Sequence, residues 1–184
     1  MFYIAGLGNP GEDYKNTRHN TGRMAVESFE KKNEMSPKKL QIIRSDEFMN
    51  NSGKAVGKII KSKKAAENLI VVHDDLDLPL GTIKISFNKG VGGHRGLNSV
   101  AKAVKTLEFV RIRIGISPST PSGKIKKPGA NLTPKAAEKA VIDFILGQFK
   151  PKELEVLKKV FKKTGEAIQT IVADGRDRAM NIFN

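Results

Sequence analysis

The sequence predicts an α/β fold in a single domain, and three observations support this. Its 184 residues are enough for one domain with a real core and are few for two. Apolar runs of strand length alternate with stretches of helical period along the chain. One apolar run, "LIVV" at 69–72, is nearly continuous, as in a central strand that is covered on both faces. No repeat or linker divides the chain, so we expect one domain over 1–184.

The patterns place the individual elements in order. Strands are expected at 2–7, 39–45, 68–73, 81–87 and 109–116. The last two alternate clearly, with isoleucines on one face and Lys84, Arg111 or Arg113 on the other. Helices are expected at 21–32, 52–62, 96–105, 133–149 and about 151–173. Thr133 is a good N-cap for the fourth helix, because Pro134 follows it in the first turn. The Ser-, Pro-, Gly- and Lys-rich stretch 117–132 predicts a long basic loop.

The charge of the chain favours a polyanionic partner. Lys and Arg number 33 against 19 Asp and Glu, which gives a formal net charge of +14. Nucleic acid attracts such a surface through counterion release. A general basic bias that only serves solubility is the alternative. We expect nucleic acid to be the partner.

Other bulk properties favour a protein of the cytoplasm. The chain has no cysteine, so it forms no disulfides and uses no thiolate chemistry, in keeping with a reducing compartment. Its apolar runs are far shorter than the ~20 residues of a membrane span. The first residues run directly into a strand pattern rather than a signal peptide. We expect a cytoplasmic protein with no membrane partner.

The stretch "GLGNPG" (6–11) has the glycine spacing of a dinucleotide-binding fingerprint. That fingerprint requires a helix that opens within the motif, and an acidic residue about 20 residues later at the end of a strand. Here the glycines lead into the polar, aperiodic "EDYKNTRHN", and Glu27 and Glu30 fall inside a helical pattern. The sequence therefore favours a tight turn after the first strand over a cofactor site.

The candidate residues for acid–base chemistry are histidines in loops or at strand ends: His19, His73 and His94. Asp74 closes the apolar strand, and the carboxyl ends of strands border the ligand crevice in open α/β sheets. If His19 and Asp74 meet there, they form a base with an orienting partner. A solvated or capping imidazole is the alternative for each histidine.

The segment "HDDLDLPLG" (73–81) clusters three carboxylates, Asp74, Asp75 and Asp77. Clustered oxygens suit Mg²⁺, whereas a turn with capping and solvated charges needs no metal. The chain has neither a phosphate-binding loop of the Walker type nor an H-E-x-x-H motif, so metal ranks below the alternatives.

Two further polar segments precede expected helices. In "EFMNNSG" (47–53), Asn50 or Asn51 can cap a helix or offer a donor and an acceptor to a ligand amide. In "GVGGHRG" (90–96), Arg95 beside a helix N-terminus can bind an anion, although a simple turn also explains the glycines.

Several stretches, in this order, together resemble bacterial-type peptidyl-tRNA hydrolases. They are "GLGNPGEDYKNTRHNTG", "FMNNSGKAV", "HDDLDLPLG", "GGHRGLNSV", "RIRIGI" and "DRAMNIFN". The resemblance implies a compact α/β domain around a twisted, mixed and largely parallel sheet flanked by helices. It implies cleavage of the ester between a peptide and the 3′-terminal ribose of tRNA, with no metal or organic cofactor. The implied partner is peptidyl-tRNA, through its CCA end and acceptor stem, and we expect a monomer.

The resemblance also implies roles for individual residues. His19 would be the general base that activates water, Asp74 its partner, and Asn9 the group that recognises the first peptide amide. The remaining positions would bind the substrate or line the cleft: Tyr14, Phe48, Met49, Asn50, Gly92 and His94. Lys84 and Arg113 match basic positions that contact tRNA phosphate.

The chain departs from the family pattern at several points. Arg95 stands where an asparagine usually binds tRNA and substrate, and Ser86 stands where a basic residue is frequent. The region 31–47 is short, so we expect the strand at the sheet edge to be reduced or missing. The loop at 117–132 is longer than usual, and we interpret it as a mobile basic lid over the cleft.

Overall fold

The strands form one twisted sheet in the computed structural model, which describes residues 1–32 and 39–184. Its order is β2-β1-β3-β5-β4. The strands are β1 (Phe2–Gly6), β2 (Leu40–Ile43), β3 (Leu69–Pro79), β4 (Ile83–Phe87) and β5 (Val110–Ser117). Neighbouring strands run parallel except β4, which is antiparallel to β5. The sheet is therefore mixed and largely parallel, as predicted.

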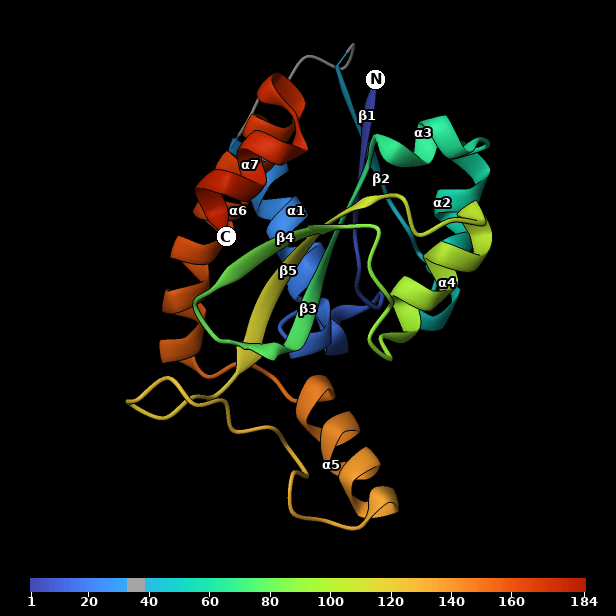
Figure 1. The fold of residues 1–184 in the computed structure, drawn as a ribbon. Helices are drawn as coiled ribbons and strands as arrows, with labels where there is room; N and C mark the ends of the chain where they lie inside the picture. Colours follow the sequence, from blue (N-terminus) through green and yellow to red (C-terminus); the bar gives the residue numbers. More distant parts are fainter. Residues whose placement is uncertain (33–38) are drawn as a thin grey trace.

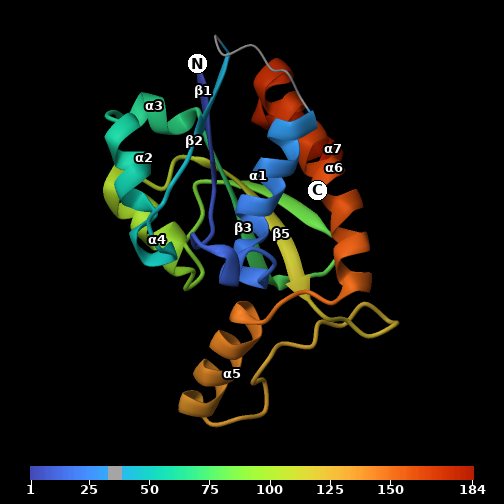
Figure 2. The ribbon, with the colours of Figure 1, turned by 180° about the vertical axis from the view of Figure 1, so that it is seen from behind.

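Helices cover both faces of the sheet (Figures 1 and 2). One face carries α1 (Thr21–Lys32), α6 (Pro151–Asp174) and α7 (Arg176–Phe183). The other carries α2 (Gly53–Ile59), α3 (Lys63–Glu67) and α4 (Arg95–Val104). Helix α5 (Pro134–Leu146) stands apart, beyond the carboxyl ends of β3 and β5 (Figure 1). Short 3₁₀ helices lie at Glu12–Tyr14 (η1), Arg18–Asn20 (η2) and Met49–Asn51 (η3).

Strand alternation divides the apolar core between the two faces. Ile112 and Ile114 of β5 are fully buried against the layer of α1 and α6, whereas Val71 of β3 and Phe109 pack toward α2 and α4. Burying each such side chain contributes about 1.5–3 kcal/mol. The run 69–72 of β3 is apolar on both faces because both faces are covered there, whereas β5 carries Arg111 and Arg113 on its second face.

The predicted strands and helices are present, with three differences. The single helix expected at 52–62 ends at Ile59, and α3 then begins because Ser62 accepts a hydrogen bond from the backbone of Ala65 at 3.1 Å. Helix α7 was not predicted. Gly175, at φ +91°, ends α6 and separates it from α7. None of the described helices has the length and apolar content to cross a membrane.

The third difference is the length of β3, which runs on through "HDDLDLP" where a turn was one alternative. His73, Asp74 and Asp75 still pair with β5, and the register shifts only between Asp75 and Pro79. Gly115 permits this close pairing, because a Cβ there would lie 2.1 Å from the Pro79 carbonyl oxygen. The strand was hard to recognise in this segment because its side chains are polar. They lie at the carboxyl end of the sheet, outside the apolar core that gives strands their alternating pattern.

The short region at 31–47 still contributes an edge strand. Part of it, 33–38, lies outside the described residues. Strand β2 follows and pairs with β1 over four residues, so the edge strand is short but not missing.

Candidate active site

A glycine brings the first motif against the central strand. A Cβ on Gly22 would lie 2.1 Å from the Val72 carbonyl oxygen, so only glycine lets the start of α1 approach β3 this closely. The same carbonyl accepts a hydrogen bond from Leu7 at 2.9 Å. The approach places η2, which carries His19, beside the end of β3, which carries Asp74.

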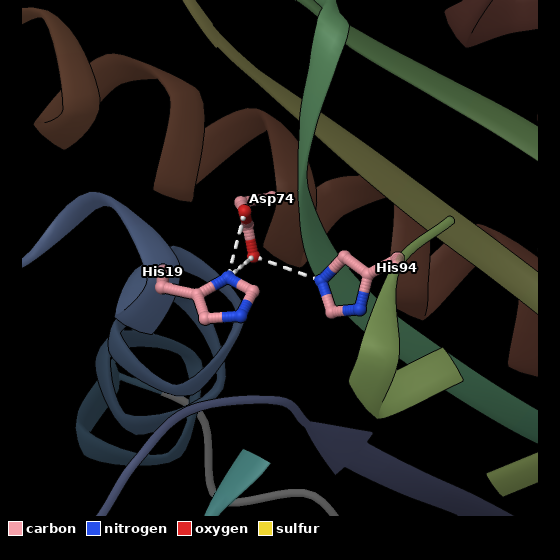
Figure 3. A group of neighbouring side chains, drawn as sticks. All are labelled: His19, Asp74 and His94. Carbon is pink, nitrogen blue, oxygen red and sulfur yellow. Dashed lines mark hydrogen bonds and ion pairs between the residues drawn. The ribbon is translucent and has the colours of Figure 1, made fainter. Parts of the chain in front are cut away.

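Asp74 lies between two imidazoles from different parts of the chain (Figure 3). Its carboxylate is 3.0 and 3.1 Å from Nδ1 of His19 and 3.0 Å from Nε2 of His94. His19 and Asp74 are buried, and His94 is partly buried. The sequence-predicted pair of His19 and Asp74 is therefore in contact, and His94 joins it directly.

The hydrogen bonds define the tautomers of both imidazoles. His94 is the N-cap of α4, and its Nδ1 accepts the backbone N–H of Leu97 at 3.3 Å. The proton of neutral His94 is therefore on Nε2, which donates to Asp74. A carboxylate only accepts, so His19 donates from Nδ1. This leaves Nε2 of His19 as a free basic nitrogen, with no hydrogen-bond partner among the described residues.

Electrostatics within this cluster follow from burial and charge. Burial alone would raise the pKa of Asp74, but the charges and hydrogen bonds of His19 and His94 outweigh it and hold that pKa well below its usual range. Burial lowers the pKa of His19, but the charge and hydrogen bond of Asp74 prevail, so the pKa is raised. Arg95 acts against this rise through its positive charge.

Neighbouring His73 is a neutral, buried imidazole. Burial, and then the charge of His94, lower its pKa to about 3. Its Nδ1 donates to the Asp74 carbonyl oxygen at 2.7 Å, and its ring meets that of His94 edge-on at 5.0 Å between centroids. His73 therefore supports the backbone of Asp74 rather than acting as a base.

Asn9 presents a hydrogen-bond donor to the same site. Its Oδ1 accepts the backbone N–H of Met49 at 2.8 Å, so Nδ2 is the atom left for a ligand. Asn20 holds Asn9 from behind, accepting from its N–H at 2.8 Å and donating to its carbonyl at 2.9 Å. The turn "GLGNPG" thus delivers Asn9 to the site.

These residues open onto one cleft of about 1080 Å³. Its lining includes Asn9, His19, Asp74, Phe48, Met49 and Asn50, together with Gly92, His94, Arg95, Lys84 and Arg113. Helix α5 forms a further wall through Val141, Ile142 and Leu146. Tyr14 is not part of the lining and meets the Phe48 ring edge-on at 6.2 Å. Tyr14 is therefore the one predicted site residue that stands outside the cleft.

The cationic side chains of the cleft differ in whether they are paired with a carboxylate. Arg113 donates from Nε to Asp75 at 2.6 Å, whereas Lys84, its partner in the β4–β5 register, is exposed. Arg95 reaches across to Glu138 of α5 at 3.6 Å. Ser86 is buried and offers no charge, so Lys84 is the free cation that β4 contributes.

Comparison with known proteins decides the family. The family model for peptidyl-tRNA hydrolase matches residues 3–184. The chain belongs to the peptidyl-tRNA hydrolase family. It is 35% identical to the peptidyl-tRNA hydrolase of Thermodesulfovibrio yellowstonii, over 100% of this chain and 99% of that protein. It is 37% identical to that of Herpetosiphon aurantiacus, over 100% of this chain and 90% of that protein.

The fold agrees with solved peptidyl-tRNA hydrolases. The crystal structure from Acinetobacter baumannii superposes with a TM-score of 0.78 at 27% identity, covering 100% of this chain and 94% of that one. The predicted family, enzyme class and fold are thereby confirmed: the chain is a hydrolase of this family.

The alternatives weighed from the sequence fit this site poorly. The dinucleotide interpretation of "GLGNPG" is wrong, because the motif leads into η1 and the first α-helix begins only at Thr21. The carboxylates of "HDDLDLPLG" do not converge on a common point: Asp75 pairs with Arg113, and Asp77 pairs with Lys127 at 2.5 Å.

A different trio, His19, Asp74 and His94, brings ligand-type atoms within 4.8 Å of one another. The two hydrogen bonds of His94 use both of its ring nitrogens, so this trio is arranged as a hydrogen-bonded cluster. A metal ligand here would need an imidazole nitrogen without its proton.

Sequence reasoning missed several residues of this peptidyl-tRNA hydrolase site. Each of them contacts another part of the site: Asn20 bonds to Asn9, Arg111 to the backbone at Lys89 and Gly90, and Glu138 of α5 pairs with Arg95. Arg111 shares the polar face of its strand with Arg113, and this alternation was the available signal. Asn20 lies in the same motif as its partner Asn9, but no periodicity shows that the two meet. Glu138 carries no local signal, because its partner Arg95 is distant in the sequence.

Proposed function

We propose that the chain hydrolyses the ester between a peptide, or an N-blocked amino acid, and the 3′-terminal ribose of tRNA. The observation that carries this is the mostly buried His19–Asp74–His94 cluster, which lines a cleft together with cationic side chains. A histidine base with an orienting carboxylate suits ester hydrolysis by water.

In the proposed reaction, Nε2 of His19 takes a proton from a water molecule as its oxygen attacks the ester carbonyl carbon. The tetrahedral intermediate then collapses, the bond to the ribose 3′-oxygen breaks, and that oxygen takes the proton from His19. The products are a free peptide carboxylate and tRNA. General-base help of this kind contributes about 10²–10⁴-fold to the rate.

Asp74 would hold His19 in the tautomer that leaves Nε2 free and would stabilise the imidazolium that forms. His94 would hold Asp74 through its second hydrogen bond. Asn9 would donate from Nδ2 to a substrate carbonyl oxygen, at the first peptide group or at the oxyanion.

The cleft offers different surfaces to the two parts of the substrate. Lys84 and Arg113 would contact tRNA phosphate, as would Arg95 once it leaves Glu138. Phe48 is exposed and meets Tyr14, a pairing that suits stacking against terminal bases. The peptide and the 3′ end would also contact Met49, Asn50, Gly92 and His94.

The loop between β5 and α5 would act as a basic lid. Lys127 from this loop lines the cleft and pairs with Asp77. Deleting 121–127 should weaken tRNA affinity; unchanged affinity would argue against the lid.

The proposed biological role is to recycle peptidyl-tRNA released during translation. We propose that the protein does so as a cytoplasmic monomer and without a cofactor. The net charge of +14 would attract tRNA largely regardless of the peptide that it carries.

The test compares N-acetyl-aminoacyl-tRNA with unblocked aminoacyl-tRNA, in EDTA, for wild type and His19→Ala. We expect cleavage of the blocked substrate alone, with its loss in His19→Ala while tRNA affinity is retained. Tight tRNA binding without cleavage by wild type would instead indicate an RNA-binding module. Full activity of His19→Ala would refute the base.

A further inference from the structure

His94 depends on a loop with little packing of its own. The loop 88–94 joins β4 to α4 and contains Asn88, Gly92 and Gly93 at positive φ. A Cβ on Gly90, Gly92 or Gly93 would meet nothing within 4 Å, so little side-chain packing surrounds this backbone. Within the loop, the N–H of His94 donates to the Val91 carbonyl at 3.1 Å. Val91 is partly buried against the core beside α2 and α4, whereas the backbone before it, at 88–90, is exposed and depends on contacts from outside the loop.

Arg111 extends from strand β5 to the backbone of this loop. It is buried, with 2% exposure, and its Nη1 donates to the Gly90 carbonyl oxygen at 2.8 Å. Its Nη2 donates to the carbonyl oxygen of the preceding residue, Lys89. Nη1 and Nη2 thus hold the carbonyl groups of two consecutive residues, which directly precede Val91 and come shortly before His94.

The surroundings of Arg111 distinguish it from a cation that serves phosphate. No carboxylate of residues 1–32 or 39–184 forms an ion pair with it, whereas its neighbour Arg113 has Asp75. Its Nε is buried without a partner in this part of the chain. Arg111 belongs to the cleft lining, but each of its outer nitrogens already donates one hydrogen bond to the loop. The Phe109 ring lies 5.7 Å from the guanidinium carbon. Burying this charge has an energetic cost, since burial lowers the pKa of Arg111.

We propose that Arg111 is a positioning residue: it fixes the loop 88–94 so that His94 reaches Asp74. The contacts form a continuous series from Arg111 through the Lys89 and Gly90 carbonyls to Val91, His94, Asp74 and His19. The proposal rests on the proposed function, because it assigns Arg111 to the orientation of the same general base. Arginine suits this role because its planar fork spans two acceptors, whereas lysine presents a single point charge.

Arg111→Lys is the informative variant because it keeps the charge and loses the fork. We expect its kcat for N-acetyl-aminoacyl-tRNA to fall about 10–100-fold, the scale of a small misplacement in the site, with KM nearly unchanged. Without the hydrogen bond from His94, Asp74 interacts more strongly with His19. The acid limb of the pH–rate profile should therefore move to higher pH, although the charge at position 111 is retained.

Two comparisons separate positioning from other roles. Adding Arg111→Lys to His94→Ala should slow the enzyme no further, because both changes remove the same hydrogen bond. The matched variant Arg113→Lys should raise KM and leave the acid limb in place. If Arg111→Lys raises KM alone, or if its effect adds in full to that of His94→Ala, Arg111 binds substrate or acts independently and the proposal is wrong.

Hydrogen exchange provides a readout that needs no substrate. Peptides covering 88–94 should exchange faster in Arg111→Lys than in wild type or Arg113→Lys, while the rest of the sheet stays protected. Unchanged exchange in this loop would overturn the proposal even if activity falls. If wild type fails to cleave N-acetyl-aminoacyl-tRNA, the proposed function fails, and the exchange experiment still tests what Arg111 holds.

Discussion

The two sides of the cleft are held in different ways. The hydrogen-bonded cluster of His19, Asp74 and His94 is mostly buried and sits on elements that pack against the central strand. The cover, which we define as residues 118–146, contains no buried side chain in α5 and lies over the end of the sheet.

The contacts of the cover are of two kinds. Arg18 donates to the Gln148 carbonyl at 3.0 Å and stacks on Phe144 at 4.5 Å, which anchors the end of α5 beside η2. Across the cleft, the contacts are exposed ion pairs, Arg95–Glu138 and Lys127–Asp77. Buried hydrogen bonds fix geometry, whereas exposed ion pairs are weak and are screened by salt. The side that carries the buried cluster should therefore be rigid, and the cover should yield to a polyanionic substrate.

The largest effect is expected from Asp74→Asn, which removes the charge at the centre of the cluster. The rate should fall by about 10²–10⁴-fold, because His19 loses both its orientation and the partner of its imidazolium. Asp74 raises the pKa of His19, so the residual activity should show an acid limb moved to lower pH. The measurement is kcat/KM against pH. An unmoved acid limb would contradict the electrostatic role of Asp74.

A smaller but clear effect is expected from Gly22→Ala, which tests the rigid side by packing. The new Cβ would lie 2.1 Å from the Val72 carbonyl oxygen, so η2 and α1 must move away from β3. Overpacking of this kind costs about 1–3 kcal/mol, or roughly 2–4 °C of Tm for each kcal/mol in a protein of this size. Calorimetry provides the measurement. Gly90→Ala, where nothing lies within 4 Å, is the control for Tm.

The rigid side should also respond to pH through His73. Its pKa is lowered to about 3 in the fold, so between pH 6.5 and 3 the unfolded chain binds a proton that the folded chain does not. The stability contributed by neutral His73 is therefore lost as pH falls through this window, at up to about 1.4 kcal/mol per pH unit.

His73→Asn keeps a donor for the Asp74 carbonyl but does not titrate. Its Tm should decline less steeply than that of wild type from pH 7 to pH 5. The raised pKa of His19 acts in the opposite direction in both proteins, so the difference isolates His73. Parallel Tm profiles would contradict this account.

The smallest effect is expected from Glu138→Gln, which releases Arg95 from the cover. An exposed pair contributes about 0–1 kcal/mol, so Tm should change little. Affinity for tRNA should rise by at most about fivefold as Arg95 becomes free, and the gain should vanish at high salt. Measurement of tRNA affinity at two salt concentrations tests this. A large loss of stability would show that the cover is held as firmly as the buried cluster.

The sequence predicted most of the elements, and all but one of its candidate site residues line the cleft, because local patterns carry that information. Alternation identified β4 and β5, and the polar stretch after the first strand marked His19 as a candidate. The extension of β3 through "HDDLDLP" was not predicted, because its side chains follow the needs of the site rather than strand alternation. Tyr14 was expected to bind tRNA. It contacts Phe48 but does not itself line the cleft, so this role stays a prediction.

The sequence by itself determined the α/β class, most of the strands and helices along the chain, the basic charge, and the residue types at the site. Those properties depend on periodicity, capping and composition, which act over a few neighbouring residues. Only the tertiary structure decided that Asp74 holds two imidazoles, that α4 sets the tautomer of His94, and that Arg111 reaches the backbone before it. The contacts of Asp74 and Arg111 join residues 20 or more positions apart, which meet because the central strands end at the same edge of the sheet and glycine lets the segments approach. The bond from Leu97 to His94 is local, but it gains its meaning only because the other nitrogen of His94 reaches Asp74.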